Sequence, residues 1–191
     1  EAKLKVTEIN LGYHTSGLLL GGGFFNKFVT QFDYPNKKIR LISQDSADVA
    51  KFKNIETRRQ KGTGMPIVKI GLPDDNHLWL LLDTGNSGGM VVERKVAKRM
   101  GWLEKADSKS TISMGVNSII ETESFRIPQL QFGPFELENV LVTIPAEGKS
   151  SYLASQYKTT GSRIKGKKVQ GIIGYDVFKH FLITVDYKGG H

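Results

Sequence analysis

Apolar positions along most of the chain either alternate with polar ones or form short uninterrupted runs, which is typical of β-strands. From this pattern we expect strands over residues 65–70, 78–82, 110–114, 119–127 and 137–144. Residues 92–100 differ, because their apolar side chains recur at helical spacing and Gly101 follows them, where a glycine commonly ends a helix. The sequence therefore predicts a mostly β protein with two or three short helices.

Two segments of the chain are similar at a constant offset of 153 residues, since residues 19–34 align with residues 172–187. Both predict the end of a buried strand, a glycine, a short helix and a strand that ends on Asp-Tyr. In the first segment a turn and a further strand over residues 38–42 follow. We interpret this as an internal repeat in which Asp33 and Asp186, the aspartates of the two Asp-Tyr steps, have structural roles.

The strongest motif is an aspartate at the end of an apolar strand. Three leucines at residues 80–82 lead into Asp83, Thr84 and Gly85. A turn of this kind holds the carboxylate by hydrogen bonds from backbone and hydroxyl groups. Asp-Thr-Gly is a common tripeptide, but its position after a buried strand and before the helix at residues 92–100 makes it specific. In this context it resembles the catalytic turn of the aspartic proteases of the retropepsin-like superfamily, particularly their bacterial members.

Two further segments agree with that resemblance. One is similar to the segment that passes beneath the catalytic turn in this superfamily and closes a ψ-shaped loop; it consists of Ile172, Ile173 and Gly174. A glycine is needed there because two backbones approach closely. The other resembles the flap, a hairpin that folds over substrate and excludes water, although its sequence is also that of an ordinary hairpin turn. Its residues are Met114, Gly115, Val116 and Asn117.

The resemblance extends over about residues 62–187 and implies a closed β-barrel lobe of the acid-protease type with short helices. Residues 62–191 would form this complete lobe, residues 46–61 a polar and basic linker, and residues 1–45 the C-terminal half of a preceding lobe. Because the sequence starts at Glu1 rather than at a methionine, we expect that a segment upstream has been removed.

The resemblance also implies an activity, the hydrolysis of peptide bonds in peptide or protein substrates. Two carboxylates that share one proton would activate a water molecule, and Asp83 would be one of them, with Thr84 and Gly85 fixing its turn. No metal or organic cofactor is implied. The chain contains one Asp-Thr-Gly, so the second carboxylate would come from a missing N-terminal fragment of the first lobe or from a second copy of the chain. The repeat offset places it roughly 70 residues before Glu1.

Two other interpretations stay open. Asn86 stands where the superfamily usually has Ala or Ser, which, with the single Asp-Thr-Gly, favours a peptide-binding or assembly module that has lost turnover. Residues 85–89 read Gly-Asn-Ser-Gly-Gly, which fits a serine hydrolase with Ser87 as nucleophile. A serine enzyme also needs a histidine and an aspartate in a suitable order. The candidates are His14 and His77 upstream, or Asp176 with His180 or His191 downstream.

Composition narrows the function classes. The chain has 27 basic and 19 acidic residues, a net charge of +8, and no apolar run approaches the roughly 18 residues of a membrane span. Residues 149–168 are rich in basic residues and contain no acid or interleaved aromatic strand pattern, so we expect an open basic loop rather than a nucleic-acid surface. Within it, residues 161–168 nearly match the P-loop motif. They end in lysine, however, at the position where a P-loop has the Ser or Thr that binds magnesium. Scattered histidines and the lack of cysteine make a metal site unexpected and leave the compartment open.

Overall fold

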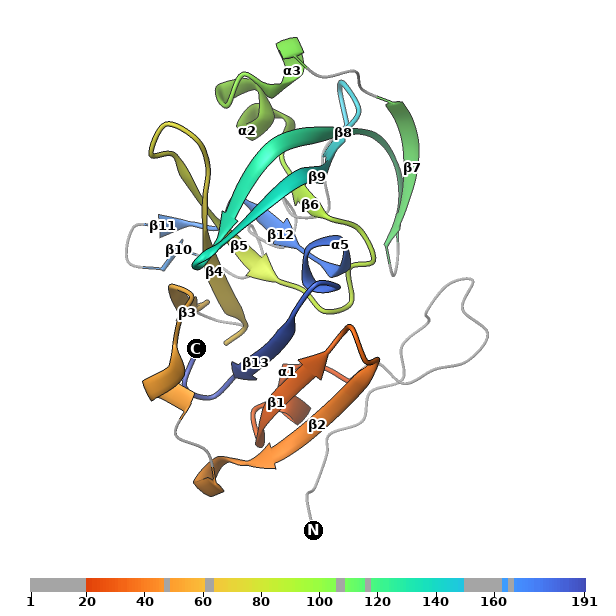
Figure 1. Cartoon of the computed structure of the whole chain (residues 1–191). Coiled ribbons are helices and arrows are strands. Elements are labelled where there is room, and N and C mark those ends of the chain that lie inside the picture. The colour runs from red at the N-terminus through yellow and green to blue at the C-terminus, as the bar shows by residue number, and fades with distance from the viewer. Residues whose placement is uncertain are drawn as a thin grey trace.

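The structure of the chain is a computed structural model, and it describes residues 20–46, 49–60, 64–105, 109–115, 118–149, 163–164 and 167–191. Within these ranges the strands predominate and the helices are short, as Figure 1 shows. The α-helices are α1 (Gly22–Phe25), α2 (Arg94–Arg99), α3 (Trp102–Lys105) and α5 (Tyr175–Phe178), and two 3₁₀ helices span Gln44–Ser46 and Val49–Phe52. None of the described helices is long and apolar enough to cross a membrane.

The described strands form a large sheet, a three-stranded sheet and a small hairpin. The large sheet consists of β3 (Thr57–Arg59), β4 (Pro66–Gly71), β5 (His77–Leu82), β6 (Met90–Val92), β7 (Lys109–Gly115), β8 (Ser118–Phe132), β9 (Phe135–Pro145) and β12 (Gly171–Ile173). The three-stranded sheet consists of β1 (Phe28–Asp33), β2 (Lys38–Ser43) and β13 (Leu182–Asp186). The hairpin consists of β10 (Arg163–Ile164) and β11 (Lys167–Lys168).

The large sheet closes on itself into a barrel. Its strand order is β3-β4-β5-β12-β6-β9-β8-β7, and β4 also pairs with β8, where Ile70 lies opposite Phe132 and Gly71 opposite Gln131. A Cβ atom on Gly71 would lie 2.9 Å from the Gln131 Cβ, so the closing contact favours glycine. This ring confirms the expected mostly β, barrel-forming lobe.

β12 joins the two halves of the barrel beneath the end of β5. It runs parallel to β5, with Ile173 opposite Leu82, and antiparallel to β6, with Ile173 opposite Met90. Both β5 and β12 are buried along nearly their whole length, which explains why they read as continuous apolar runs rather than as alternating strands. The segment of residues 172–174 is thereby placed directly beside the point where β5 delivers Asp83.

The three-stranded sheet brings the two similar segments of the sequence together. β1 pairs with β13 in the antiparallel sense, and Gln31 lies opposite Thr184. The Gln31 side-chain amide donates a hydrogen bond of 3.2 Å to the Thr184 hydroxyl, and the two residues are 153 positions apart. The helices α1 and α5, which precede the two strands, also have bounds that differ by this number at both ends.

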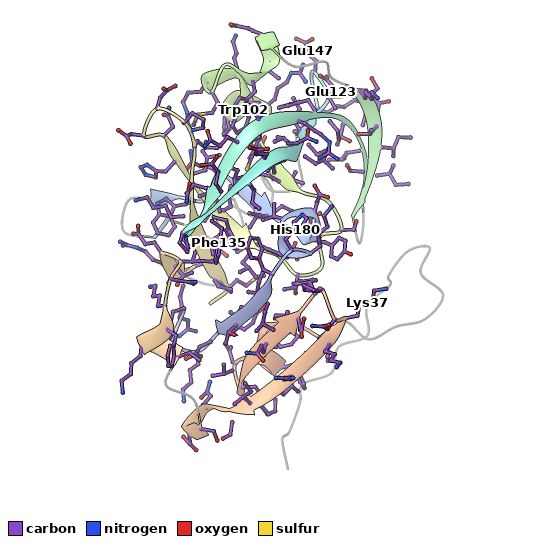
Figure 2. The ribbon with its side chains drawn as sticks, in the orientation of Figure 1. Lys37, Trp102, Glu123, Phe135, Glu147 and His180 are labelled. Atoms are coloured by element: carbon purple, nitrogen blue, oxygen red, sulfur yellow. The ribbon has the colours of Figure 1, made fainter. Side chains whose placement is uncertain are left out.

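The inner face of this small sheet packs onto the core of the barrel. Ile183, Val185 and Phe32 are buried in the same apolar cluster as Phe132 and Phe178. In Figure 2, Lys37 labels the turn between β1 and β2, whereas Trp102 of α3 and Glu123 of β8 lie in the upper part of the view, away from the small sheet. The barrel thus forms the larger body, with the small sheet beneath it.

Several segments differ from the sequence-based expectation. Part of the expected linker is strand β3, because Thr57–Arg59 pairs with β4 and the Lys69 amide donates to the Glu56 carbonyl at 2.9 Å. Arg58 lies over the Trp79 ring, 5.3 Å from its centroid. One of the basic residues that indicated a linker therefore packs on an aromatic side chain. In the expected basic loop, β10 and β11 pair as a hairpin, and residues 150–162 and 165–166 lie outside the described ranges.

Candidate active site

Asp83 is the first residue after β5, and its backbone is fixed from below by β12. The Asp83 amide donates a hydrogen bond of 3.0 Å to the Ile173 carbonyl, and the Asn86 amide donates one of 3.2 Å to the Asp83 carbonyl. The Gly85 amide donates to Asp83 Oδ1 at 2.9 Å. Asp83, Thr84 and Gly85 therefore form the tight turn that the sequence predicts, with the carboxylate held by a backbone amide.

Asn86 closes the loop that follows this turn. Its Oδ1 accepts a hydrogen bond of 3.1 Å from the Gly88 amide, and its Nδ2 donates one of 3.3 Å to the Gly89 carbonyl. Its own carbonyl accepts a hydrogen bond of 2.8 Å from the Tyr175 amide at the start of α5. From the sequence alone, Asn86 differs from the Ala or Ser that is usual in the superfamily, and this favours loss of turnover. The contacts explain the asparagine in another way, because its side chain and carbonyl hold the loop in shape.

Gly174 lies where the loop after Asp83 meets the end of β12. Its amide donates a hydrogen bond of 2.9 Å to the Gly89 carbonyl. A Cβ atom at this position would lie 2.5 Å from both Nδ2 and the carbonyl oxygen of Asn86. Two backbone segments that are about ninety residues apart thus touch here, as the sequence leads us to expect of Ile172, Ile173 and Gly174.

The charge state of Asp83 is shaped by its burial. Burial raises the pKa of the Asp83 carboxyl above its ordinary value of 3.8, while the amides of Gly85 and Asn86 act in the opposite direction. Two tyrosines lie within electrostatic reach of this carboxylate. Burial, with further contributions that include the Asp83 charge, raises the pKa of Tyr34 and of Tyr187 from 10.0 to about 12. Both phenols are therefore neutral in the pH range in which carboxylates titrate.

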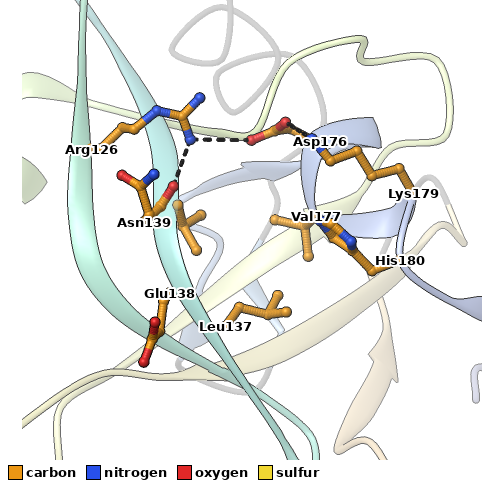
Figure 3. Close-up of a pocket in the computed structure, with 9 residues that line it drawn as sticks. Arg126, Leu137, Glu138, Asn139, Asp176, Val177, Lys179 and His180 are labelled. Atoms are coloured by element: carbon orange, nitrogen blue, oxygen red, sulfur yellow. Dashed lines mark hydrogen bonds and ion pairs between the residues drawn. The ribbon is translucent and has the colours of Figure 1, made fainter.

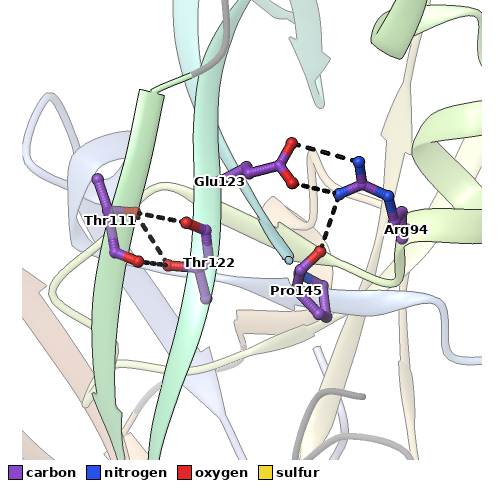
Figure 4. Close-up of polar contacts among 5 residues, drawn as sticks. All are labelled: Arg94, Thr111, Thr122, Glu123 and Pro145. Carbon is purple, nitrogen blue, oxygen red and sulfur yellow. Dashed lines mark hydrogen bonds and ion pairs between the residues drawn. The ribbon is translucent and has the colours of Figure 1, made fainter. Parts of the chain in front are cut away.

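The hairpin β7–β8 is anchored at its base. Figure 4 shows Arg94 of α2, whose guanidinium makes a hydrogen bond of 2.7 Å to Glu123 of β8, a second of 3.3 Å to the same carboxylate, and a third of 3.2 Å to the Pro145 carbonyl. Hydroxyl groups link the strands, as in the 2.9 Å contact between Thr111 and Thr122. Of the expected flap residues, Met114 and Gly115 end β7, whereas Val116 and Asn117 lie outside the described ranges.

The other candidate residues have different surroundings. Ser87 is exposed, and none of its contacts within the described ranges is a hydrogen bond to His77, His180 or His191. Asp176 pairs with Lys179 at 2.6 Å and lies 4.0 Å from Arg126.

Asp176, Lys179 and Arg126 line a pocket of about 210 Å³ between α5, β8 and β9, which Figure 3 shows, and Asp83 is not part of its lining. No group of three or more histidine or acidic residues that could hold a metal ion occurs among the described residues. The aspartates of the Asp-Tyr steps are structural, since Asp33 and Asp186 accept hydrogen bonds from the amides of Asn36 and Gly189.

Comparison with known proteins agrees with this geometry. The aspartyl protease family model matches residues 68–177, which include the Asp83 turn, the hairpin β7–β8 and β12. The chain therefore belongs to the aspartyl protease family, and the resemblance to the retropepsin-like superfamily is confirmed at that level. No curated protein sequence matches the chain. One similar solved structure is a retropepsin-like aspartic protease from Rickettsia conorii, with a TM-score of 0.44 and 11% identity over 68% of this chain and 89% of that one.

The sequence and its resemblance point to Asp83 and Gly174, but not to Tyr34 and Tyr187, which lie within electrostatic reach of Asp83. Tyr34 and Tyr187 follow the aspartates of the two Asp-Tyr steps, which the pattern indicates only as strand ends. The signal in the sequence is that the tyrosine occurs in both segments of the repeat, although a strand end does not require an aromatic residue.

Proposed function

We propose that this chain is part of an aspartic endopeptidase and that Asp83 supplies one of its two catalytic carboxylates. The observation that carries the proposal is the position of Asp83. It follows a buried strand, its backbone is bonded to Ile173 of β12, and its Oδ1 accepts a hydrogen bond from Gly85. Membership of the aspartyl protease family, whose model spans this turn, supports the same conclusion.

The proposed chemistry needs two carboxylates that share one proton. Two carboxyl groups a few ångströms apart cannot both ionise, because their charges would repel each other. One carboxyl therefore stays protonated and polarises the substrate carbonyl, while the other accepts a proton from the attacking water. The pair titrates as a unit. The burial that raises the pKa of Asp83 above its ordinary value supports this role, because burial favours the protonated form of the carboxyl.

The second carboxylate is proposed to come from a lobe related to the first by a local two-fold axis. In an antiparallel pair, an axis perpendicular to the sheet and between two opposite residues exchanges the strands. The pairing of Gln31 with Thr184 has the register that such an axis would produce for segments offset by 153 residues. Tyr34 and Tyr187 are equivalent under the same offset, and Asp83 lies within electrostatic reach of both. A group close to both members of such a pair lies near the axis, where a second aspartate would approach it.

An uncovered apolar surface on β2 supports the presence of that lobe. Ile39 and Leu41 lie on the same face as the buried Phe32 and Thr30, yet they are 64% and 44% exposed. Residues 1–45 are accordingly proposed as the C-terminal half of the first lobe, residues 46–61 as the connection, whose Thr57–Arg59 joins the barrel sheet as β3, and residues 62–191 as the second lobe. The covering part is proposed to be an upstream segment of the same gene product rather than a second copy, because one chain already holds both segments of the repeat.

Expression of the full reading frame with an unfolded casein-like substrate, at acidic and at neutral pH, tests the proposal. Cleavage by the parent protein is expected to disappear in Asp83→Asn and to persist in Ser87→Ala. Loss of activity in Ser87→Ala with full activity in Asp83→Asn would instead support the serine hydrolase. Binding of the substrate without cleavage by the parent protein would support the peptide-binding module. A second Asp-Thr-Gly or Asp-Ser-Gly after an apolar strand, about 50–100 residues before Glu1, is expected in the reading frame.

A further inference from the structure

The turn that follows β13 repeats the turn that joins β1 to β2. Residues 34–37 and residues 187–190 are turns, and the offset of 153 residues converts one into the other. Lys37 and Gly190 occupy equivalent places in them, and both have a positive φ, of 54° and 76°. In the first segment this turn reverses the chain into the hairpin of β1 and β2. The second turn should therefore direct the chain back along β13.

Hydrogen bonds after the second turn show the beginning of such a hairpin. The Asp186 amide donates a hydrogen bond of 2.6 Å to the His191 carbonyl, and the His191 amide donates one of 3.2 Å to the Asp186 carbonyl. The equivalent residues of the first segment, Asp33 and Lys38, are paired where β2 begins. Figure 1 shows the C-terminal end on the side of β13 away from β1. His191 thus has the position of the first residue of a further strand.

The outer edge of β13 is open to such a strand. Among the described strands, β13 pairs only with β1. Successive amides and carbonyls point to alternate edges of a strand, and those of Asp186 point to His191, away from β1. The amides and carbonyls of Leu182 and Thr184 therefore point to the same open edge. A row of backbone groups of this kind is a template for an additional strand.

Apolar side chains beside this edge are exposed. Leu182 is 55% exposed, whereas its equivalent in the first segment, Val29, lies opposite Ile42 of β2 and is 1% exposed. Phe135 is 45% exposed and packs on Phe181, the residue before Leu182, with ring centroids 5.2 Å apart. A strand along the outer edge of β13 would supply Leu182 with the kind of neighbour that Ile42 is for Val29.

We propose that the outer edge of β13 binds an antiparallel strand of the same gene product, formed by the segment that continues from His191. The sheet then has four strands, with β2 and the added strand at its edges and β1 and β13 at its centre. A continuous segment is favoured over a second copy of the chain, because the turn at residues 187–190 already delivers it in register without the entropy cost of association. The proposal concerns how the two lobes are joined and goes beyond the proposed reaction.

The register of β1 and β2 defines the chemistry of the added strand. The offset of 153 converts that register into one in which positions 193 and 195 lie opposite Thr184 and Leu182. Their amides pair with β13, so neither position should be a proline. Positions 192 and 194 lie opposite Val185 and Ile183, on the face that is buried in the core of the barrel, so we expect apolar residues there.

Hydrogen exchange followed by NMR tests the proposal, in this chain and in the same chain extended to the C-terminal end of its reading frame. In the unextended chain the amides of Leu182 and Thr184 should exchange rapidly, since they lie on the open edge. In the extended chain their exchange should be slower by about tenfold or more. The amides of Ile183 and Val185, which point to β1, are the internal control and should be protected in both proteins.

Gly190→Val in the extended chain tests the role of the turn. Gly190 has a positive φ, and a Cβ atom there would collide with the Arg59 side chain, so a β-branched residue should prevent the reversal. Leu182 and Thr184 should then exchange as fast as they do in the unextended chain. Gly148→Val is the matched control, because Gly148 has a similar φ of 74° but lies in the turn after β9, with nothing within 4 Å of its Cβ position. It should leave the exchange of both amides unchanged.

Three results would overturn the proposal. A reading frame that ends shortly after His191, or that has a proline at position 193 or 195, leaves no strand to bind. Unchanged exchange at Leu182 and Thr184 in the extended chain shows that the added segment lies elsewhere. Protection that appears in the unextended chain and increases with its concentration shows that a second copy occupies the edge.

The comparison of the extended and unextended chains needs neither substrate nor substitution. It therefore decides the proposal even if Gly190→Val does not fold. It also separates this proposal from the proposed function. If the exchange behaves as expected but Asp83→Asn still cleaves substrate, the proposed function fails while the added strand stands.

Discussion

Gln31 and Thr184 lie directly opposite each other in the pair of β1 and β13, and their side chains are joined by a hydrogen bond of 3.2 Å. The same separation of 153 residues relates the turns that follow the two strands. There, the Asn36 amide donates to Asp33 at 3.1 Å, and the Gly189 amide donates to Asp186 at 2.9 Å. Pairing between equivalent positions, flanked by equivalent turns, is the register that a local two-fold axis would produce, as the proposed two-lobed arrangement requires.

The two glycines that the offset relates, Gly21 and Gly174, should respond differently to alanine. In Gly174→Ala the new Cβ would lie 2.5 Å from Asn86, so we expect a loss of about 1–3 kcal/mol in the free energy of unfolding, measured with urea. In Gly21→Ala the Cβ meets nothing within 4 Å, and the change should be within about 0.5 kcal/mol.

The same pair of variants also tests the proposed first lobe. In the longer protein a loop equivalent to residues 86–89 would pack on Gly21, so Gly21→Ala should become as destabilising as Gly174→Ala. If Gly21→Ala remains neutral in the full reading frame, the two-lobed arrangement is wrong.

Replacement of Asn86 by alanine should destabilise the loop after the Asp83 turn. The variant loses the hydrogen bonds to Gly88 and Gly89, and we expect a cost of about 1–3 kcal/mol in urea unfolding. Asn76→Ala is the matched control, because that side chain makes one exposed hydrogen bond to the Pro73 carbonyl and its loss should cost less. Equal costs for the two variants would show that the Asn86 contacts do not hold the loop.

Asp83 should make the stability of the chain depend on pH. Its pKa is higher in the folded chain than its ordinary value of 3.8, so between these two values the folded state binds more protons than the unfolded state. The free energy of unfolding therefore falls as pH rises through that window. Asp83→Asn removes the ionisation, so its stability relative to the parent should increase from about pH 4 to pH 7. Ser87→Ala, which does not titrate, should differ from the parent by a constant amount over the same range.

The ion pair between Arg94 and Glu123 should contribute more to the free energy of unfolding than an exposed ion pair does. Both side chains are partly buried, the pair is bidentate, and Arg94 also reaches the Pro145 carbonyl. We expect Arg94→Lys, which cannot form the forked contact, to cost about 1–3 kcal/mol in urea unfolding. The exposed pair of Lys149 and Glu121, 3.4 Å apart, provides the comparison, since Lys149→Met should cost less than about 1 kcal/mol. A similar effect of both substitutions would contradict the anchoring role of Arg94.

Local patterns in the sequence were enough to locate most strands, the helix at residues 94–99 and the Asp83 turn. This is because strand and helix periodicity, the glycine after a helix and the leucines before Asp83 all act over a few neighbouring residues. Gly174 follows from the resemblance to the retropepsin-like superfamily, whose segment beneath the catalytic turn has a glycine where two backbones approach closely. Strand ends were less accurate, as in β8, which continues past Ile127 to Phe132 because it pairs with both β9 and β4.

The remaining features depend on which distant segments meet, and periodicity holds no information about partners. β12 lies between β5 and β6, Asn86 packs against Gly174, and Thr57–Arg59 becomes a strand because the edge of β4 is there to pair with it. The tyrosines are the clearest case. An Asp-Tyr step at the end of a strand does not indicate that Tyr187 lies within electrostatic reach of Asp83, because the two residues are about a hundred positions apart. The path of the whole chain brings them together, and burial then changes their chemistry.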